Sequence, residues 1–466
     1  MQIPKGSRLS KAQQQAFDGL EKTNNSYFIY GAAGTGKSSF IDYFRKKTKK
    51  NTITLTFTGL ASILIKGQTI HSFFQLPPRL IVKNDPKLKI LNKRINQMKA
   101  LDVLIIDEIS TVRCDLLNAI DDLLRKYRRN NQPFGGVQML FIGDFFQIAP
   151  VEPRSANAWK AFRNDFESIW FFDCDGYKEL NPELLEFKTI HRQYRDNTLR
   201  GYLQEIRQNQ YNSETLQFFN SRITPSEKIP TGAIALCPTN KKVDEYNNDY
   251  LKRLSSEPIT YIGNKTGKYK ESEMPTDMEL TLKEKARVMM LSNDSGGRWS
   301  NGSFAVITSL AKDSIKIRLP LGNGKYTPEY KVEKEIWEKY DYRIKKPKPT
   351  NIKKDTYEAV VIGSFEQYPI RLGRATTIHK SQGQTFDEVL VDFDIGAFTH
   401  GQAYVALSRT RSSNGIYLKE PLLATDIKFD QLVVDYYNKH FVFDQIEGKP
   451  DAAPGLFDSI EEEIPF

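Results

Sequence analysis

The chain has 466 residues, of which 39% are hydrophobic and 27% are charged, and its formal net charge is +10. No apolar run approaches the roughly 18–20 residues of a membrane span, and the N-terminus lacks an apolar secretory core, so we expect neither a membrane protein nor a secreted one. Three widely spaced cysteines, Cys114, Cys174 and Cys237, predict a reducing compartment and no disulfide framework.

The charge is unevenly distributed along the chain. Residues 444–466 contain seven acidic side chains and one lysine, so the rest of the chain is more basic than the total suggests. A basic body with an acidic tail suits a polyanionic partner such as nucleic acid. The plain alternative, a soluble basic protein without such a partner, is equally compatible with charge alone.

Residues 8–20 are predicted to form a helix that begins at the N-cap Ser10. Its glutamines lie just before a phosphate-binding motif. A glutamine amide both donates and accepts, so Gln13, or else Gln14, could pair with an adenine edge. The ordinary alternative is a solvated helix face.

The sequence YFIYGAAGTGKS at residues 27–38 is the central motif of the chain. An aromatic strand leads into a match to G-x-x-x-x-G-K-[ST], and a helical pattern follows it. The residues that we expect to bind ATP are Gly31, Gly34, Thr35, Gly36, Lys37 and Ser38. The glycines let backbone N–H groups surround the phosphates, Lys37 reaches the β- and γ-phosphates, and Ser38 holds Mg²⁺. The alternative is a glycine-rich turn between a strand and a helix.

Residues 52–58 alternate as a strand does, and polar and aromatic residues follow them. Thr58 could donate to DNA phosphates at the mouth of a parallel sheet, and His71 and Phe73 could stack on bases. For any single phenylalanine, a place in the core is the more ordinary interpretation. Residues 77–99 are basic and contain prolines, which predicts an exposed insertion.

Two further apolar strands end in polar residues. LDVLIIDE at residues 101–108 ends in Asp107, which would hold the water shell of Mg²⁺, and Glu108, which would activate the attacking water. The strand that begins at residue 137 leads to Gln147, which could sense the γ-phosphate or orient the water. The carboxyl ends of parallel strands share one edge, so these side chains are expected to converge on one triphosphate.

A second α/β unit begins with a strand at residues 233–240 and has no phosphate loop of its own. Strand and turn signals at residues 298–364 predict a small inserted β domain, after which the α/β pattern resumes. Residues 402–412 are predicted to form a helix that ends in Arg409 and Arg411, and an arginine supplied across a cleft stabilises transferring phosphoryl charge. Arg192, in TIHRQY, is a further candidate functional residue. A surface ion pair is the more common role of any one arginine.

In this order, the segments resemble the Pif (petite integration frequency) family of DNA helicases, in the B branch of helicase superfamily one. The matching stretches are LSKAQ, GAAGTGKSS, TFTGLAS, TIHSFF, IIDEIS, FGGVQMLFIGDFFQIAPV, TIHRQ, ATTIHKSQGQTFD and QAYVALSRTRS. They extend over residues 9–412. The chain departs from the family pattern at Ala12, where an acidic residue is usual, and at Ile148-Ala149-Pro150, where Leu-Pro-Pro is commoner.

The resemblance implies an α/β fold with two RecA-like domains. The expected divisions are residues 1–180 for the first domain, 181–297 with 365–440 for the second, 298–364 for a β-barrel insertion, and about 75–95 for a wedge insertion. It also implies ATP and Mg²⁺ as cofactors and 5′→3′ movement on single-stranded DNA. The family processes are DNA replication, repair, recombination and, in some members, telomere maintenance.

The resemblance also implies roles by motif position. The implied ATP-site residues are Lys37, Ser38, Asp107, Glu108 and Gln147 from the first domain, with Arg192 and Arg409 as arginine fingers from the second. The implied DNA-side residues are Thr58, His71, His379 and Ser381. An alternative function is a DNA-stimulated ATPase that mainly displaces proteins from DNA.

The acidic end, residues 441–466, is predicted to be a disordered tail. Its last residues, DSIEEEIPF, end like the acidic tip of bacterial single-stranded-DNA-binding proteins. We therefore expect either a protein partner that accepts such a tip or a tail that only shields the DNA channel. The tip favours a bacterial cytoplasm, or that of a phage-infected bacterium. We expect forked or structured DNA as further partners and a monomeric protein.

Overall fold

The computed structural model describes the residues 9–57, 67–77, 79–83, 85, 88, 92–153, 156–193, 195–299, 303–322, 325–345 and 356–440. The predictions for Thr58 and for the acidic tail lie outside these residues. Among the described residues, no helix has both the length and the apolar character that crossing a bilayer requires.

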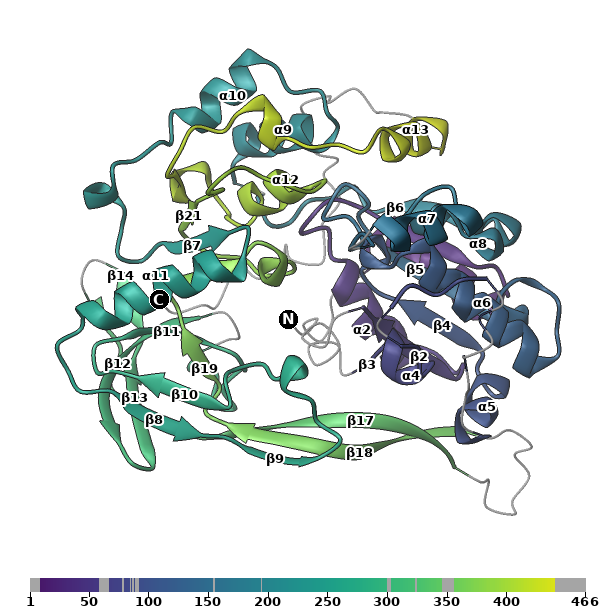
Figure 1. Cartoon of the computed structure of the whole chain (residues 1–466), viewed down its shortest axis with the longest axis horizontal. Helices are drawn as coiled ribbons and strands as arrows, with labels where there is room; N and C mark the ends of the chain where they lie inside the picture. Colours follow the sequence, from purple (N-terminus) through teal and green to yellow (C-terminus); the bar gives the residue numbers. More distant parts are fainter. Residues whose placement is uncertain are drawn as a thin grey trace.

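The first unit is a six-stranded parallel sheet with helices on both faces (Figure 1). Its elements are α1 (Lys11–Lys22), β1 (Tyr27–Tyr30), α2 (Lys37–Lys47), β2 (Thr52–Thr56), β3 (Gln68–Thr69), α4 (Ile70–Phe73), α5 (Asn92–Lys99), β4 (Val103–Ile106), α6 (Cys114–Arg128), β5 (Gln138–Gly143), α7 (Ala156–Asp165), α8 (Asp175–Leu180) and β6 (Glu183–Glu186). The strand order is β3-β2-β4-β5-β1-β6. This arrangement confirms the predicted order of strand, phosphate loop and helix.

The central strands β1 and β4 carry only apolar and aromatic side chains, as is typical of parallel strands whose two faces are both covered. Along β1, Phe28 and Tyr30 point into one core cluster, and Tyr27 and Ile29 into the opposite one. The predicted N-terminal helix is also confirmed, since Ser10 caps α1 with a reciprocal capping box.

The second unit is a four-stranded parallel sheet in the order β20-β7-β21-β22. The elements after the first unit that belong to it or flank it are α9 (Asn197–Arg207), α10 (Ser213–Asn220), β7 (Ile234–Cys237), α11 (Asn240–Arg253), β20 (Ala375–Thr377), β21 (Val389–Val391), α12 (Gln402–Leu407), β22 (Ile416–Leu418) and α13 (Gln431–His440). The two parallel α/β units agree with the predicted fold class and fit RecA-like helicase domains.

A β region is inserted between β7 and β20. Its strands are β8 (Ile259–Ile262), β9 (Asn264–Gly267), β10 (Glu279–Leu282), β11 (Arg287–Met290), β12 (Phe304–Ala311), β13 (Ser314–Arg318), β14 (Pro320–Gly322), β15 (Lys325–Tyr326), β16 (Tyr330–Val332), β17 (Glu335–Lys345), β18 (Thr356–Gln367) and β19 (Ile370–Leu372). The largest sheet has the order β16-β13-β12-β11-β19. The region is therefore longer than the predicted 298–364, because short apolar runs such as that of β11 cannot be told from strands of an α/β sheet by pattern alone.

The predicted boundary at residue 180 is also too early. Strand β6 pairs in parallel with β1 and so completes the first sheet. At the far end of the chain, α13 returns to the first unit, where Val433 and Tyr437 join its core. The ring of Tyr436 stacks on that of Phe172 with their centroids 4.3 Å apart.

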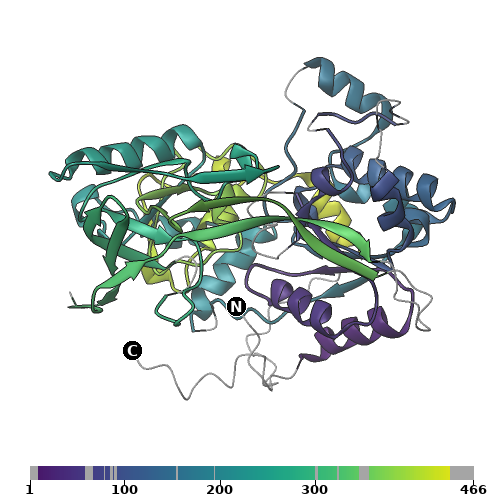
Figure 2. The ribbon, with the colours of Figure 1, turned by 90° about the horizontal axis from the view of Figure 1, so that it is seen from below.

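The predicted exposed insertion at residues 77–99 is wrong for at least one described residue. Ile81 is buried in the first core, and its backbone N–H donates to Asp115 Oδ2 at 2.9 Å. The long antiparallel pair β17–β18 crosses from the β region toward α5 of the first unit, a path that Figures 1 and 2 both show. Helix α5, at the end of the segment 77–99, thus lies where the first unit and the β region meet.

Candidate ATP site and DNA-side residues

The phosphate loop has the conformation that its glycines permit. Gly34 and Gly36 have φ values of +85° and +82°, in the left-handed region that favours glycine. A Cβ on Gly31 would lie 2.5 Å from the carbonyl oxygen of Phe187, and one on Gly34 would lie 2.6 Å from Cβ of Arg192. The loop is therefore packed against the segment that follows β6.

The side chains of the loop are divided between structural and ligand-facing positions. Lys37 Nζ donates to the carbonyl oxygens of Gly31 at 2.6 Å and Ala32 at 3.0 Å, and burial lowers its pKa while Asp144 and Glu108 oppose that shift. Thr35 is buried and donates to the Ala32 carbonyl at 3.0 Å. Ser38 is exposed in the first turn of α2. Lys37 is thus held above the loop, where a phosphate chain would compete with the carbonyls.

The structure brings Gln13, and not Gln14, to the loop. Gln13 is buried, and its Nε2 lies 3.3 Å from the place where a Cβ on Gly36 would stand. Its Oε1 accepts from the Ser10 N–H at 3.0 Å. Gln14 instead donates to Asp18 on the exposed face of α1.

Asp107 and Glu108 follow β4. In the parallel sheet, β5 lies between β4 and β1, the strand that leads into the phosphate loop. Burial and the charge of Glu108 raise the pKa of Asp107. Burial also raises the pKa of Glu108, against the charge of Lys37. Glu108 has a φ of +52°, and its buried Oε2 has no hydrogen-bond partner among the described residues. An unpartnered carboxylate oxygen beside a phosphate loop is placed to accept a proton from water.

The donor set fits a magnesium ion. Mg²⁺ prefers oxygen ligands, and the Asp107 carboxylate and the Ser38 hydroxyl supply them near the loop. The unpartnered Oε2 of Glu108 shows that the buried carboxylates are not neutralised by their protein neighbours alone. The described residues contain no group of three or more metal-ligating side chains, so a metal here would share its ligands with nucleotide and water.

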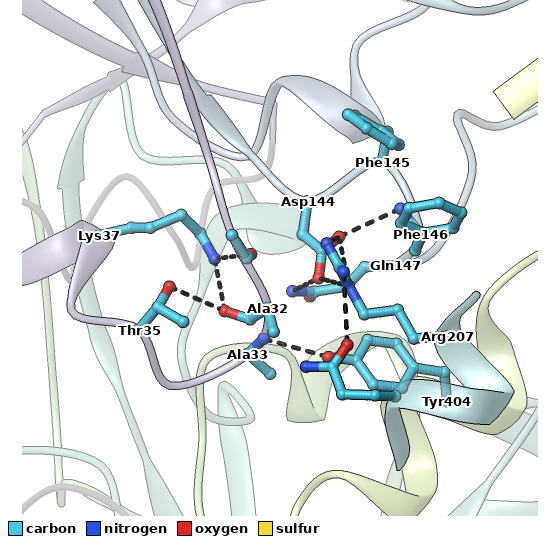
Figure 3. A network of polar contacts seen from close by, with 12 residues as sticks. Ala32, Ala33, Thr35, Lys37, Asp144, Phe145, Phe146, Gln147, Arg207 and Tyr404 are labelled. Atoms are coloured by element: carbon cyan, nitrogen blue, oxygen red, sulfur yellow. Dashed lines mark hydrogen bonds and ion pairs between the residues drawn. The ribbon is translucent and has the colours of Figure 1, made fainter. Parts of the chain in front are cut away.

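Gln147 lies at the junction of the two units. It is buried, its Nε2 donates to Asp144 Oδ2 at 3.3 Å, and its Oε1 accepts from Gln382 Nε2 at 3.4 Å. Figure 3 shows Lys37, Asp144 and Gln147 around the same space as the loop. The structure therefore brings two of the predicted ATP-site residues, Lys37 and Gln147, to the same space, together with Asp144, which was not predicted.

Two arginines lie near the site: Arg192, in the segment after β6, and Arg409, just after α12. Arg192 Nη1 donates to the Ser408 carbonyl at 3.1 Å, and burial together with the charge of Arg409 lowers its pKa to about 9. Arg409 is buried, and it donates to the carbonyls of Val405, Ser381 and Gln384 and to the Ser408 hydroxyl. Burial lowers the pKa of Arg409 to about 10, so it stays charged at neutral pH. A buried cation held by neutral groups is available for a phosphate.

Two residues at the junction were missed by sequence reasoning. Tyr404 accepts at its hydroxyl from the Ala33 N–H at 3.2 Å, across the two units. Arg207 forms an ion pair with Asp144, with Nη2 and Oδ1 separated by 3.1 Å. Tyr404 lies inside the QAYVALSRTRS motif, which could have pointed to it, whereas Arg207 ends an ordinary amphipathic helix and carries no signal.

Of the two described residues of the first unit that were predicted to contact DNA, one is partly exposed and the other is fully buried. His71 is half-buried, its ring contacts Phe57 edge-on, and burial and Arg113 lower its pKa. Phe73 has no exposed surface and packs on Phe74 with ring centroids 4.9 Å apart. The prediction that Phe73 stacks on a base is wrong for this conformation, and the ordinary alternative of a core aromatic holds.

The second unit shows the same division. His379 is half-buried, its ring lies 6.3 Å from that of the exposed Phe398, and burial lowers its pKa. Ser381 is fully buried, its hydroxyl donates to the Ile378 carbonyl at 2.7 Å, and its own carbonyl accepts from Arg409. The predicted DNA contact of the Ser381 side chain is therefore wrong here, because that side chain supports the turn that holds Arg409.

Comparison with known proteins places the chain in a family. A family model described as PIF1-like helicase matches residues 8–175. A crystal structure of Bacteroides sp Pif1 in complex with ADP-AlF4 is similar over 93% of this chain and 97% of that chain, with 31% identity and a TM-score of 0.83. The chain belongs to the Pif1-like helicase family.

Other members of the family are similar along most of the chain. The ATP-dependent DNA helicase Pif1 of Bdellovibrio bacteriovorus is 29% identical over 88% of this chain and 87% of its own length. A structure of Bacteroides Pif1 bound to single-stranded DNA has 31% identity, covers 93% of this chain and 97% of that chain, and has a TM-score of 0.66. The Pif1 resemblance thus extends through both α/β units and the β region between them.

Proposed function

We propose that this chain is an ATP-driven helicase that moves 5′→3′ on single-stranded DNA and unwinds duplex or structured DNA. Its family membership makes it an ATP-dependent DNA helicase, and relatives are described with single-stranded DNA and with forked DNA. The observation that carries the proposal is that one site is built from several segments of the chain. Lys37, Glu108 and Gln147 of the first unit lie at the phosphate loop, and the cations Arg192 and Arg409 lie beside them.

In this mechanism the triphosphate replaces the carbonyls that Lys37 now contacts. Glu108 accepts a proton from the attacking water through its free Oε2. Arg192 and Arg409 stabilise the charge on the transferring phosphoryl group. Mg²⁺, held by Ser38 and Asp107, would neutralise part of the phosphate charge.

The ATP cycle is transmitted to DNA through the junction. Triphosphate attracts the arginines toward Lys37 and draws the units together, and loss of the γ-phosphate releases them. His71 on the first unit and His379 on the second are half-buried and supply one DNA contact each. Alternating grip by the two units then gives one directional step per cycle.

We propose further that the β region closes into a small barrel and that residues near 75–95 act as a wedge. Strand β11 pairs with β12, which follows it, and also with β19, which lies about 80 residues further along the chain. This pairing supports a compact inserted fold. Helix α5 contacts β17, which supports a surface formed jointly by the first unit and the β region at which the two DNA strands separate.

The test is steady-state ATPase activity with and without single-stranded DNA, for wild type and Glu108→Gln. DNA should strongly stimulate the wild type, and the variant should lose the stimulated activity because its amide cannot accept the proton. Glu179→Gln, an exposed carboxylate at the end of α8, is the matched control. ATPase activity that is indifferent to DNA would refute the helicase assignment while leaving the nucleotide site intact.

The alternative is an ATPase that mainly displaces proteins from DNA. Parallel assays on a forked duplex and on a protein–DNA roadblock distinguish the two functions. Duplex unwinding at rates comparable with ATP turnover supports the helicase, and displacement without unwinding supports the alternative.

We also propose that the chain is monomeric and that its acidic end binds a protein that accepts the Ile-Pro-Phe tip of single-stranded-DNA-binding proteins, in a bacterial or phage-infected bacterial cytoplasm. The support is the sequence alone: a run of acidic residues that would steer the segment to a basic pocket, followed by Phe466 as an aromatic plug. Deleting residues 464–466 should abolish binding in a pull-down of such a partner, and Ile446→Ala upstream is the control. Unchanged binding by the truncated chain would end this proposal.

A further inference from the structure

A buried ion pair links the two units directly behind the ATP site. Asp144 follows β5 in the first unit, and Arg207 ends α9, whose Leu199, Leu203 and Ile206 lie in the second core. Asp144 is 0% exposed and Arg207 is 2% exposed. Two buried charges of this kind depend on each other, because removing one leaves the other without compensation.

The geometry of the pair is that of a fork on a carboxylate. Arg207 Nη2 lies 3.1 Å from Asp144 Oδ1, and Nε lies 3.3 Å from Oδ1 and 3.4 Å from Oδ2. The guanidinium also packs over the ring of Phe146, 4.8 Å from its centroid. Figure 3 shows Arg207 reaching this carboxylate from the opposite side to Lys37. The position of Asp144 is therefore set from the second unit.

Asp144 in turn positions Gln147. Its Oδ2 accepts from Gln147 Nε2 at 3.3 Å, and its Oδ1 accepts from the Phe146 N–H at 3.2 Å. A carboxylate only accepts, so it holds the amide with the nitrogen facing Asp144 and Oε1 facing Gln382. The orientation of Gln147 thus depends on a carboxylate that an arginine of the other unit holds.

We propose that Arg207 is a positioning residue for ATP hydrolysis, which acts through Asp144 to orient Gln147 only when the two units are correctly arranged. The inference rests on the proposed role of Gln147 at the γ-phosphate or the attacking water. It explains why a charge pair with no more than 2% exposed surface is placed at this junction: separation of the units removes Arg207 and frees the Gln147 amide. Hydrolysis is thereby confined to one domain arrangement.

A double-mutant cycle tests the inference. Arg207→Gln should lower the DNA-stimulated kcat about 10- to 100-fold, because small misplacements of a catalytic group cost about that much, while KM for ATP changes less than about threefold. In a Gln147→Ala background, the same Arg207→Gln change should lower kcat by less than about threefold, because the residues act in series. Arg253→Gln, an exposed arginine on α11, is the control for charge removal and should match the wild type.

A merely structural role for Arg207 predicts a different pattern. It would lower the melting temperature and reduce kcat by the same factor in both backgrounds, and that result would overturn the inference. Arg207→Lys keeps the charge and loses the fork, so a folded lysine variant with wild-type kcat would also overturn it. If Gln147→Ala alone left kcat unchanged, the proposed role of Gln147 would fall together with the inference. Wild-type protein without DNA-stimulated ATPase activity would instead contradict the helicase assignment.

Discussion

At the scale of single residues, Arg409 is an unusual cation. Its guanidinium is buried among backbone carbonyls, and Glu108 and Asp144 are the acids whose charges act on it. A buried guanidinium usually takes a carboxylate as its neutralising partner. The arrangement fits a residue whose anionic partner is a phosphate.

Replacement of Arg409 by glutamine should therefore lower kcat by on the order of 10³-fold, as for other arginine fingers. Nucleotide affinity should change only a few-fold, because Lys37 and the phosphate loop supply most of the ground-state contacts. Steady-state turnover and titration with a fluorescent ADP measure the two effects. Arg411→Gln, at an exposed position two residues away, is the control. A turnover loss below tenfold in a folded Arg409→Gln protein would remove the finger role.

Some site residues could be predicted because their chemistry is carried by a local pattern. The phosphate loop and Asp107-Glu108 each follow an apolar strand, and parallel strands bring their carboxyl ends to one edge. Arg207 could not be predicted, because its role depends on a partner 63 positions away and not on its neighbours in the helix. Phe73 and Ser381 were predicted to contact DNA because of their motif positions, but both are buried. A motif position does not reveal whether its side chain is exposed.

At the scale of elements, the predicted strands and helices are confirmed where a long apolar run or a capped helix marks them. Strand β6 was missed because its ends are glutamates and it lies at the edge of the sheet, where a strand need not be apolar. Helix α13 was assigned to the second unit by its position in the chain, although its buried residues pack on the first. Sequence adjacency does not decide which core a short amphipathic helix joins.

A buried histidine, His400, links the segments that precede α12 and α13 to the first unit. Before α12, His400 donates through Nε2 to the Phe145 carbonyl at 2.9 Å and accepts at Nδ1 from the Asp430 N–H at 2.9 Å. The backbone N–H of Asp430 can only donate, so the ring is neutral with its proton on Nε2. Burial lowers its pKa to about 4, which keeps it in that form at neutral pH. The link fixes α13 to the loop that carries Asp144 and Gln147.

At the scale of the whole molecule, the arrangement of the units relative to one another is the feature that we expect DNA binding to change. Two structures of Bacteroides Pif1 have the same identity to this chain, 31%, and each covers 93% of it, yet their TM-scores are 0.83 with ADP-AlF4 and 0.66 with single-stranded DNA. The unliganded Bacteroides Pif1 has a TM-score of 0.81 and the complex with ADP-AlF3 and single-stranded DNA one of 0.66, so the lower scores accompany bound DNA and not bound nucleotide. The present chain is thus more similar to the ADP-AlF4 complex and to the unliganded protein than to the DNA-bound forms.

Binding of single-stranded DNA is therefore expected to move the β region relative to the first unit, whereas ADP alone is not. Donor and acceptor dyes on Lys99→Cys in α5 and Lys325→Cys in β15 report this motion, since both positions are exposed and the three native cysteines are buried. An oligothymidine should shift the transfer efficiency at saturation, with binding followed in parallel by anisotropy. Dyes on Lys99→Cys and Lys126→Cys, both in the first unit, should show no shift. An equal shift with ADP alone would mean that the motion is not specific to DNA, and DNA binding without a shift would mean that the β region does not move relative to the first unit when DNA binds.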